Sequence, residues 1–297
     1  MPGHLIHVGC AKAGSTFLQR WFEGHPQLLY QPGGIAGFSN VFDIPRQGCA
    51  PHPELRYRVT SNEGLATPHE FGGHLGGSYH APATGPSPAA QARVAEALAD
   101  LFPTAHVLLV TRGFRSVLLS GYSQYVRDGG HLDFGTSDPA DPEPGRHIWN
   151  YDHLVELYAT RFGERLMVMP YEMLRDDADG FVREIERRLG IDHFPPPRER
   201  FNPSLSPVEL RWYPRLTRLL RRAPIGAAPR RALLRLYFPL LMDNRLRQLV
   251  RLLQFVRPAE PVTNALVTDE MVNAMRGRAE SLRANPLYEP YKEEYLL

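Results

Sequence analysis

The stretch that decides the fold is Gly9-Cys-Ala-Lys-Ala-Gly-Ser-Thr16, close to the amino terminus. It follows a short apolar run, Leu5–Gly9, and precedes a segment from Phe17 to Phe22 whose apolar residues recur at helical spacing. A strand, a small-residue loop and a helix in this order are typical of an anion-binding turn, because backbone N–H groups of the loop and of the first helical turn face the ligand. We therefore predict an anion site built from Lys12, Ala13, Gly14, Ser15 and Thr16.

This loop differs from the P-loop of ATP- and GTP-binding proteins, whose motif is G-x-x-x-x-G-K-[ST]. Gly9 and Gly14 keep the motif's spacing, but Ser15 stands where the motif has its lysine. The lysine of this loop is Lys12, and it is one of only two lysines, with Lys292, among 34 basic residues. In a chain that otherwise uses arginine, Lys12 indicates a place where a compact ammonium serves better than a planar guanidinium.

Strand-like and helix-like segments alternate after this loop. Apolar runs predict strands at Tyr57–Ser61, Ala105–Thr111 and Arg165–Pro170, and helical spacing predicts helices at Pro88–Phe102, Arg115–Arg127, Tyr151–Phe162 and Tyr171–Leu189. This alternation predicts an α/β fold that is P-loop-like, with three layers around a central parallel sheet. The phosphate site is then expected at the carboxyl ends of the strands.

The composition changes in the last third of the chain. Between Arg211 and Arg257 there are twelve arginines and a single acidic residue, Asp243, interleaved with leucines. We predict that residues 1–205 form the α/β core. Residues 206–297 are expected to form an Arg-rich helical C-terminal subdomain that completes the domain or covers the acceptor.

A second candidate motif follows the predicted strand 105–111. Arg112 stands at the strand exit, and Ser120 lies eight residues later, about two helical turns along the next helix. The two side chains can converge on one phosphate, the guanidinium as a bidentate donor and the hydroxyl as a third donor. The strand ends in Thr-Arg rather than in Asp, so the sequence indicates no magnesium-binding strand end.

Together the two segments resemble the family of sulfotransferases that use 3′-phosphoadenosine 5′-phosphosulfate (PAPS). The family's first motif, K-x-G-[ST]-[ST], grips the 5′-phosphosulfate and is matched by Lys12, Gly14, Ser15 and Thr16. Its second motif, R-x-x-x-R-x-x-x-S-x-Y, grips the 3′-phosphate and is matched in part by Arg112, Arg115, Ser120 and Tyr122. The stretch from Ser120 to Tyr125 looks closer to the carbohydrate and tyrosylprotein branches than to the cytosolic phenol branch.

The resemblance covers roughly residues 3–205, including the Tyr-Glu-x-Leu segment at Tyr171. The R-K-G loop of cytosolic members is absent, and the stretch from Asn202 to Ser206 is a candidate substitute. The resemblance implies sulfuryl transfer from PAPS, without a metal, to a hydroxyl or amine of a carbohydrate, glycolipid or other natural product. Lys12 would stabilise the leaving phosphate.

The expected catalytic base is Glu63, which follows the predicted strand 57–61 and precedes a glycine. It resembles the glutamate that carbohydrate-type members use. The alternative base is a histidine, as in cytosolic members, and the candidates are His69, His74 and His80. The spacings of these three histidines match no usual zinc pattern.

Other functions and locations are open at this point. The alternatives to a sulfotransferase are a P-loop nucleotide kinase or ATPase and a non-catalytic nucleotide-binding protein. The Arg-rich segment 211–257 suits an anionic membrane, an anionic glycan or a partner helix, or simply a solvated face, and no nucleic-acid motif accompanies it. Cys10 and Cys49 are the only cysteines, so no disulfide framework is indicated and a cytoplasmic location is expected. The sequence does not indicate an oligomeric state.

Overall fold

The computed structural model describes residues 2–10, 12–38, 54–66, 68, 88–136, 149–199, 205–273, 275 and 277–296. Within these residues, five strands form one parallel sheet in the order β2-β3-β1-β4-β5. The strands are β1 (Gly3–Gly9), β2 (Leu28–Tyr30), β3 (Tyr57–Asn62), β4 (His106–Thr111) and β5 (Leu166–Pro170). The predicted α/β class with a central parallel sheet is confirmed.

Strand β1 lies at the centre of the sheet, where it pairs with β3 on one side and with β4 on the other. Leu5 pairs with Val59 of β3 on one side and with His106 of β4 on the other. Leu5, Ile6 and Val8 are fully buried, as expected for a parallel strand with both faces covered. The chain moves from β1 to β2 and β3 on one side and then to β4 on the other. The connections that follow β1 and β4 therefore diverge at the carboxyl edge, where such folds bind ligands.

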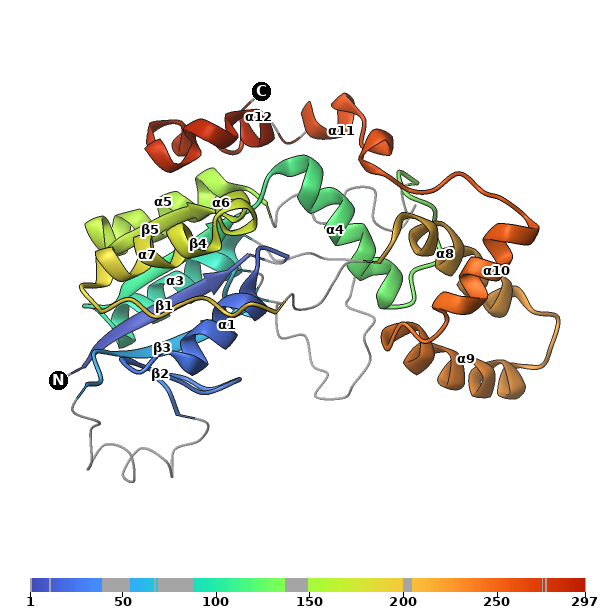
Figure 1. Ribbon diagram of the computed structural model, residues 1–297, viewed down its shortest axis with the longest axis horizontal. Helices are drawn as coiled ribbons and strands as arrows, with labels where there is room; N and C mark the ends of the chain where they lie inside the picture. Colours follow the sequence, from blue (N-terminus) through green and yellow to red (C-terminus); the bar gives the residue numbers. More distant parts are fainter. Residues whose placement is uncertain are drawn as a thin grey trace.

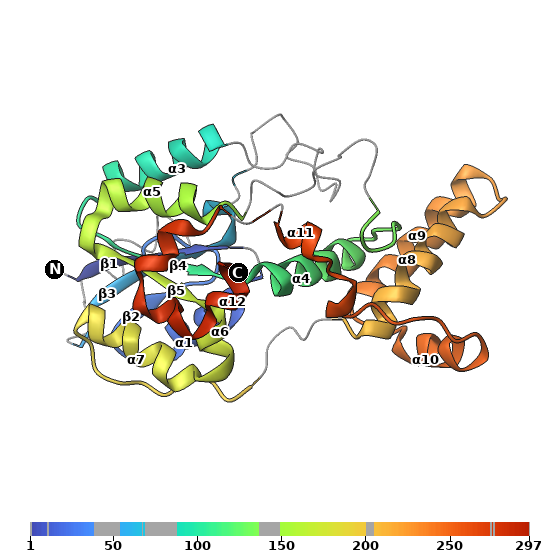
Figure 2. The same cartoon turned by 90° about the horizontal axis from the view of Figure 1, so that it is seen from above.

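Helices cover both faces of the sheet (Figure 2). Helices α1 (Ser15–Gly24) and α7 (Ala178–Leu189) lie on one face, and α3 (Pro88–Leu101) and α5 (Tyr151–Phe162) lie on the other. Helix α1 buries residues at helical spacing, and the Trp21 indole donates to the Phe194 carbonyl at 3.0 Å. This bond ties α1 to the segment that follows α7.

Helix α4 (Phe114–Arg127) leads from the carboxyl edge of the sheet to a separate group of three helices (Figure 1). We call this group the helical lobe: α8 (Pro207–Arg222), α9 (Ala227–Met242) and α10 (Arg247–Val256). Ser206 and Glu209 form a capping box at the start of α8, with Pro207 in the first turn. Among the described residues, no helix has the length and apolar character needed to cross a bilayer.

After the lobe, the chain returns to the sheet. This last segment contains η3 (Asn264–Leu266), α11 (Asp269–Asn273), η4 (Glu280–Ala284), η5 (Pro286–Tyr291) and α12 (Lys292–Tyr295). Tyr288 and Tyr295 are buried in the same hydrophobic cluster as the strands. The Asn285 amide donates to the Val168 carbonyl of β5 at 2.9 Å. The C-terminal segment is therefore part of the core packing around β4 and β5.

Two elements differ from the sequence expectation. Strand β2 was not predicted, because three residues give no measurable alternation. The helix predicted over Tyr171–Leu189 is two helices, α6 (Tyr171–Asp176) and α7. The reason lies at Asp177, whose backbone is not helical, at φ −143° and ψ 81°, and whose carboxylate accepts from the Gly180 N–H at 2.9 Å. Aspartate is a strong N-cap residue, and here it starts a new helix.

The buried hydroxyl of Tyr295 gives a test of how the C-terminal segment is held. It donates to Glu172 Oε2 at 2.5 Å, and Glu172 is fully buried. We expect Tyr295→Phe to lower the free energy of unfolding by about 1–3 kcal/mol, because the buried carboxylate loses a donor. Urea unfolding measures this difference. The control is Tyr291→Phe, at a half-buried tyrosine nearby. If Tyr291→Phe lowers the free energy of unfolding by the same amount, the Tyr295 hydroxyl does not hold the C-terminal segment in the way described.

Candidate functional site

The loop after β1 has the backbone conformation of an anion-binding turn. Lys12 and Gly14 both have positive φ, at 69° and 87°, and Ala13 donates its N–H to the Cys10 carbonyl at 3.2 Å. Glycine is favoured at position 14 by its left-handed conformation, and a Cβ there would also lie 2.7 Å from Leu174 Cδ2. Left-handed residues within a tight turn direct consecutive N–H groups toward one side, which forms a concave anion site.

The start of α1 offers further donors to the same site. Gly14 is its N-cap and provides no side-chain cap for the N–H groups of the first turn. The Ser15 hydroxyl is buried and has no hydrogen-bond partner among the residues that the structure describes. A buried hydroxyl without a partner is costly, and a bound anion would supply the missing acceptor. The N-terminal loop thus fits a phosphate or sulfate group.

Arg112 connects this loop to helix α4. Its Nη1 donates to the Lys12 carbonyl at 2.6 Å and to Ser120 Oγ at 3.1 Å, and its Nε donates to Ser116 Oγ at 3.0 Å. Arg112 and Ser120 are thus in contact, because the helical repeat places Ser120 about two turns along α4. Arg112 Nη2 makes no hydrogen bond to another residue that the structure describes, and it is the group through which a ligand can be held.

Residues of α5 and α6 also hold Arg112 in place. Its guanidinium lies 4.5 Å from the centre of the Tyr171 ring, a cation–π contact. The Tyr151 hydroxyl accepts from the Arg112 N–H at 3.1 Å and donates to its carbonyl at 2.6 Å. The next N–H, that of Gly113, donates to Glu172 Oε1 at 2.9 Å. Both the backbone and the side chain at this junction are therefore fixed by buried groups of α5 and α6.

The Lys12 ammonium points along α4. Its Nζ donates to Gln124 Oε1 at 3.3 Å, and Gln124 in turn donates to Asp128 Oδ1 at 2.9 Å. Burial lowers the pKa of Lys12 below its ordinary value, Arg127 adds to this effect, and the Glu63 carboxylate opposes it. An anion bound at the loop would favour the charged ammonium in the same way as Glu63.

Lys292 has a different setting from Lys12. It is half exposed and forms an ion pair with Glu289 at 2.8 Å, three residues earlier. Exposed pairs of this kind contribute little. Lys12 therefore lies at the candidate site, whereas Lys292 lies on the surface.

Glu63 lies at the carboxyl end of β3, next to the end of β1. A Cβ built at Gly9 would lie 2.8 Å from Ser15 Oγ and 3.2 Å from Glu63 Cγ, so the carboxylate side chain and the anion loop are neighbours. Its charge acts on Lys12 and, with burial as the larger cause, helps raise the pKa of the Cys10 thiol to about 12. Cys10 is thus a neutral, buried thiol.

Other sequence-predicted residues lie elsewhere. Arg115 donates to the Val267 carbonyl and pairs with Asp269, so its guanidinium faces the C-terminal segment. The Tyr122 hydroxyl donates to the carbonyls of Leu132 and Leu210, toward the helical lobe. Neither side chain is brought to Arg112. His69, His74, His80, Cys49 and Asn202 lie outside the described residues.

Sequence reasoning gave no role in the site to Gln124 or Asp128, and it noted Tyr171 and Glu172 as part of the Tyr-Glu-x-Leu segment without placing them in the site. The available signal was position, because Tyr171 and Glu172 come directly after strand β5, at the same edge as Lys12 and Arg112. Gln124 lies one turn beyond Ser120 on α4, on the same face. In the described part of the chain, no group of three or more His, Cys, Asp or Glu side chains is arranged to hold a metal ion.

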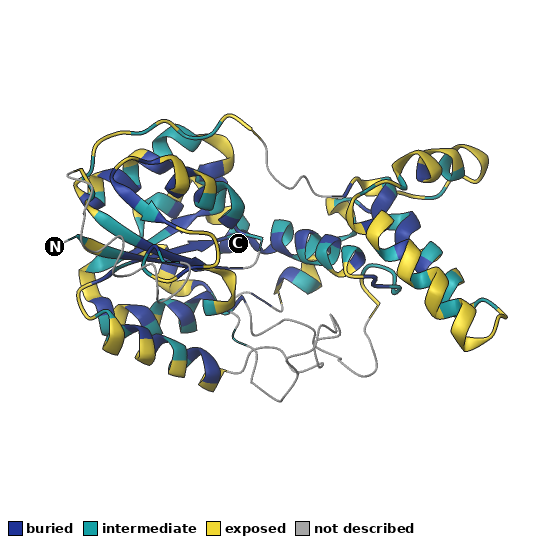
Figure 3. Cartoon of the chain, turned by 90° about the horizontal axis from the view of Figure 1, so that it is seen from below, coloured by how far each residue is buried: buried dark blue, intermediate teal, exposed yellow. Residues whose placement is uncertain are grey.

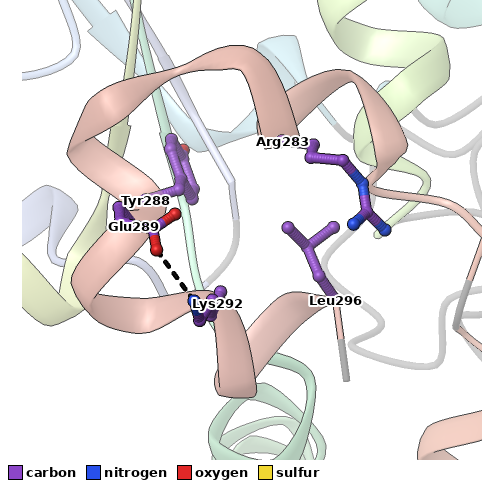
Figure 4. Close-up of a pocket in the computed structure, with 5 residues that line it drawn as sticks. All are labelled: Arg283, Tyr288, Glu289, Lys292 and Leu296. Atoms are coloured by element: carbon purple, nitrogen blue, oxygen red, sulfur yellow. Dashed lines mark hydrogen bonds and ion pairs between the residues drawn. The ribbon is translucent and has the colours of Figure 1, made fainter.

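A small pocket elsewhere in the molecule is distinct from this site. It has a volume of about 160 Å³ and is lined by Arg283, Tyr288, Glu289, Lys292 and Leu296 (Figure 4). All five residues belong to the C-terminal segment, and none belongs to the loop after β1 or to α4. The chemistry indicated by the sequence therefore does not lie in this pocket.

Comparison with known proteins gives structural neighbours only. No protein-family model and no curated protein matches the sequence. The chain is similar to a sulfotransferase from Alicyclobacillus acidocaldarius, with 19% identity and a TM-score of 0.46, over 78% of this chain and 99% of that one. It is also similar to the sulfotransferase domain from the curacin biosynthetic pathway, with 12% identity and a TM-score of 0.39, over 66% of this chain and 76% of that one. Neither name specifies a carbohydrate or tyrosylprotein acceptor. At this level of similarity the function is inferred from the residues of the chain itself.

Proposed function

We propose that this protein transfers a sulfuryl group from PAPS to a hydroxyl or amine of an acceptor. The observation that carries the proposal is the contact between the two anion-binding segments. One guanidinium, that of Arg112, donates both to the Lys12 carbonyl and to Ser120. The donor has anionic groups at both ends of one nucleoside, and two adjoining but separate anion sites suit such a molecule.

The N-terminal loop is assigned to the 5′-phosphosulfate. Backbone N–H groups, Ser15 and Thr16 would hold the 5′-phosphate, and Ser15 supports this role because its buried hydroxyl has no partner within the described part of the chain. Lys12 would place its ammonium at the oxygen that bridges phosphorus and sulfur. Arg112 and Ser120 are assigned to the 3′-phosphate, with Tyr171 behind the guanidinium.

The reaction has a simple balance of bonds. An acceptor oxygen or nitrogen attacks sulfur, the bond between sulfur and the bridging oxygen breaks, and adenosine 3′,5′-bisphosphate (PAP) leaves. The acceptor proton goes to a base, for which we propose Glu63. Lys12 stabilises the charge that develops on the bridging oxygen, by the logic that applies to phosphoryl transfer.

A nucleotide kinase or ATPase is less well supported by the same residues. Ser15 follows Gly14 where a P-loop has its lysine, and β4 ends in Thr111 followed by Arg112 rather than in an acidic residue. Calorimetry with PAP and with ATP·Mg²⁺ distinguishes the two functions. We expect tighter binding of PAP, and a preference for ATP·Mg²⁺ would favour the kinase.

The direct test of activity is mass spectrometry of acceptors incubated with enzyme and PAPS. A panel of phenols, sugars, glycolipids and amines would be examined for the mass gain of one SO₃ group. Formation of PAP together with a sulfated product supports sulfuryl transfer. Tight binding of PAP without any product across a broad panel would instead favour a non-catalytic nucleotide-binding protein.

Arg112 and Ser120 predict how the protein recognises the 3′-phosphate. We expect Arg112→Ala to weaken PAP binding about 10- to 100-fold and Ser120→Ala about 3- to 10-fold, because hydrogen bonds to charged groups contribute more than neutral ones. Calorimetry should be repeated with adenosine 5′-monophosphate, which lacks the 3′-phosphate. There both losses should largely disappear.

The matched control is Arg115→Ala. Arg115 belongs to α4, as Ser120 does, but its guanidinium contacts Val267 and Asp269. It should leave the ratio of PAP affinity to 5′-monophosphate affinity unchanged. If Arg115→Ala lowers that ratio and Arg112→Ala does not, the 3′-phosphate is held elsewhere than we propose.

A further inference from the structure

Helices α9 and α10 leave much of their apolar surface uncovered. Val250 is the buried residue of α10, whereas Phe255 is 85% exposed and Val256 is 72% exposed. In α9, Leu236 is 70% exposed. Of the thirteen exposed large hydrophobic side chains in the described residues, ten lie between Leu219 and Val256. Exposed apolar side chains concentrated in this way mark an interaction site.

The exposed residues follow helical spacing, so they form faces rather than scattered positions. In α10 the exposed face consists of Leu249, Leu252, Phe255 and Val256, and in α9 it consists of Leu233, Leu236 and Leu240. Residues three and four apart lie on one side of a helix. We call these two surfaces the outer apolar faces. The inner faces pack on α8 through Tyr237, Leu241 and Val250.

The helices that carry the outer apolar faces are rich in arginine. The segment from Arg211 to Arg257 carries twelve arginines, and its one acid, Asp243, is paired with Arg245 at 3.2 Å. Arg235 and Arg251 are exposed on α9 and α10. No acid of the same helix neutralises their guanidinium groups.

The lobe stands away from the sheet, with α4 between them (Figure 1). Exposed residues dominate the end of the molecule that α9 and α10 form (Figure 3). A flat partner can thus reach this end without meeting the α/β core.

The charge decides between two occupants of the apolar faces. A second copy of the chain in a two-fold arrangement would bring two arginine-rich surfaces together, and this repulsion opposes the gain from burying leucines. An anionic bilayer neutralises the arginines and accepts the apolar side chains in one step. Helices with arginine on one side and leucine and phenylalanine on the other bind in the plane of such an interface.

We propose that the helical lobe binds the surface of an anionic lipid bilayer, with the outer apolar faces of α9 and α10 inserted at the headgroup level. The exposed arginines of these helices contact the lipid phosphates. The protein then lies on the membrane rather than spanning it. This inference is independent of sulfuryl transfer, because it rests on exposure and charge in the lobe alone.

The test is cosedimentation with vesicles of phosphatidylcholine, with or without phosphatidylglycerol. We expect the full-length protein to bind the vesicles that contain phosphatidylglycerol, and high salt to weaken binding. The double variant Leu252→Ser with Phe255→Ser should lower the partition coefficient about tenfold or more, since both side chains lose their place in the interface. Arg235→Gln and Arg251→Gln should each lower it about fivefold.

Two matched controls lie outside the lobe. Leu101→Ser changes a side chain of α3 that is 69% exposed, and Arg187→Gln changes one of α7 that is 68% exposed. Neither should alter vesicle binding. Because all the changed residues are exposed, the melting temperature should stay constant, and circular dichroism verifies the fold.

Three results would overturn the proposal. The first is failure of the wild-type protein to bind vesicles that contain phosphatidylglycerol at low salt. The second is equal loss of binding in the lobe variants and in Leu101→Ser or Arg187→Gln. The third is a dimer, seen by analytical ultracentrifugation, that the Leu252/Phe255 double variant dissociates while vesicle binding is absent, which would assign the faces to a second copy of the chain.

Discussion

Replacing Lys12 with methionine is expected to lower kcat by about 100- to 1,000-fold while PAP affinity falls by less than about tenfold. The range is that of removing one donor to a charge that develops in the transition state. Methionine keeps most of the side-chain length, so the loop conformation is retained. The backbone N–H groups of the loop still bind the ground-state phosphate, so the loss should appear in kcat rather than in binding. Steady-state kinetics with calorimetry for PAP measures both quantities.

The second lysine supplies the control. Lys292→Met removes an exposed ion pair with Glu289 and should leave kcat unchanged. Lys12→Arg keeps the charge and is still expected to lower kcat, because a planar guanidinium does not replace a compact ammonium at one oxygen. Full activity of Lys12→Met would remove Lys12 from the mechanism.

The pH dependence gives an independent check on the same residue. Burial and Arg127 lower the pKa of Lys12 below its ordinary value of 10.5. The active form is the ammonium, so kcat/KM should fall as the pH rises through this lowered pKa. An arginine stays charged throughout, and Lys12→Arg should lose the alkaline decline along with most of its activity.

The first half of the site was readable from the sequence because it is local. The apolar run that ends at Gly9, the glycine at position 14 and the helical spacing after it together predict a strand, a turn and a helix, and the structure has all three. The same holds for Arg112 and Ser120, since a short strand–helix junction and two turns of α4 separate them.

The meeting of the two halves was not readable from the sequence. It depends on β1 and β4 being neighbours, which the strand order sets and no local pattern encodes. Tyr171 and Glu172 join the site for the same reason, because β5 lies beside β4. The buried role of Tyr295 was missed because the C-terminal segment consists of short helical turns without a regular apolar period.

Exchanging Glu63 for glutamine is expected to lower kcat by about 100- to 10,000-fold, the range of a lost general base. Glutamine has the same shape but accepts no proton at neutral pH. Because the Glu63 carboxylate lies beside the anion loop, its removal also removes repulsion from the donor. PAP should therefore bind the variant as tightly as the wild type or more tightly. A structural role for Glu63 would instead weaken PAP binding, so calorimetry separates the two roles.

Glu54→Gln is the matched control, because Glu54 is an exposed glutamate that precedes the opposite end of the same strand, β3. It should leave both kcat and PAP affinity unchanged. The competing assignment has one of His69, His74 and His80 as the base. It predicts near-normal kcat in Glu63→Gln and a large loss in a single histidine-to-alanine variant, and that pair of results would replace Glu63 as the base while leaving the two anion sites in place.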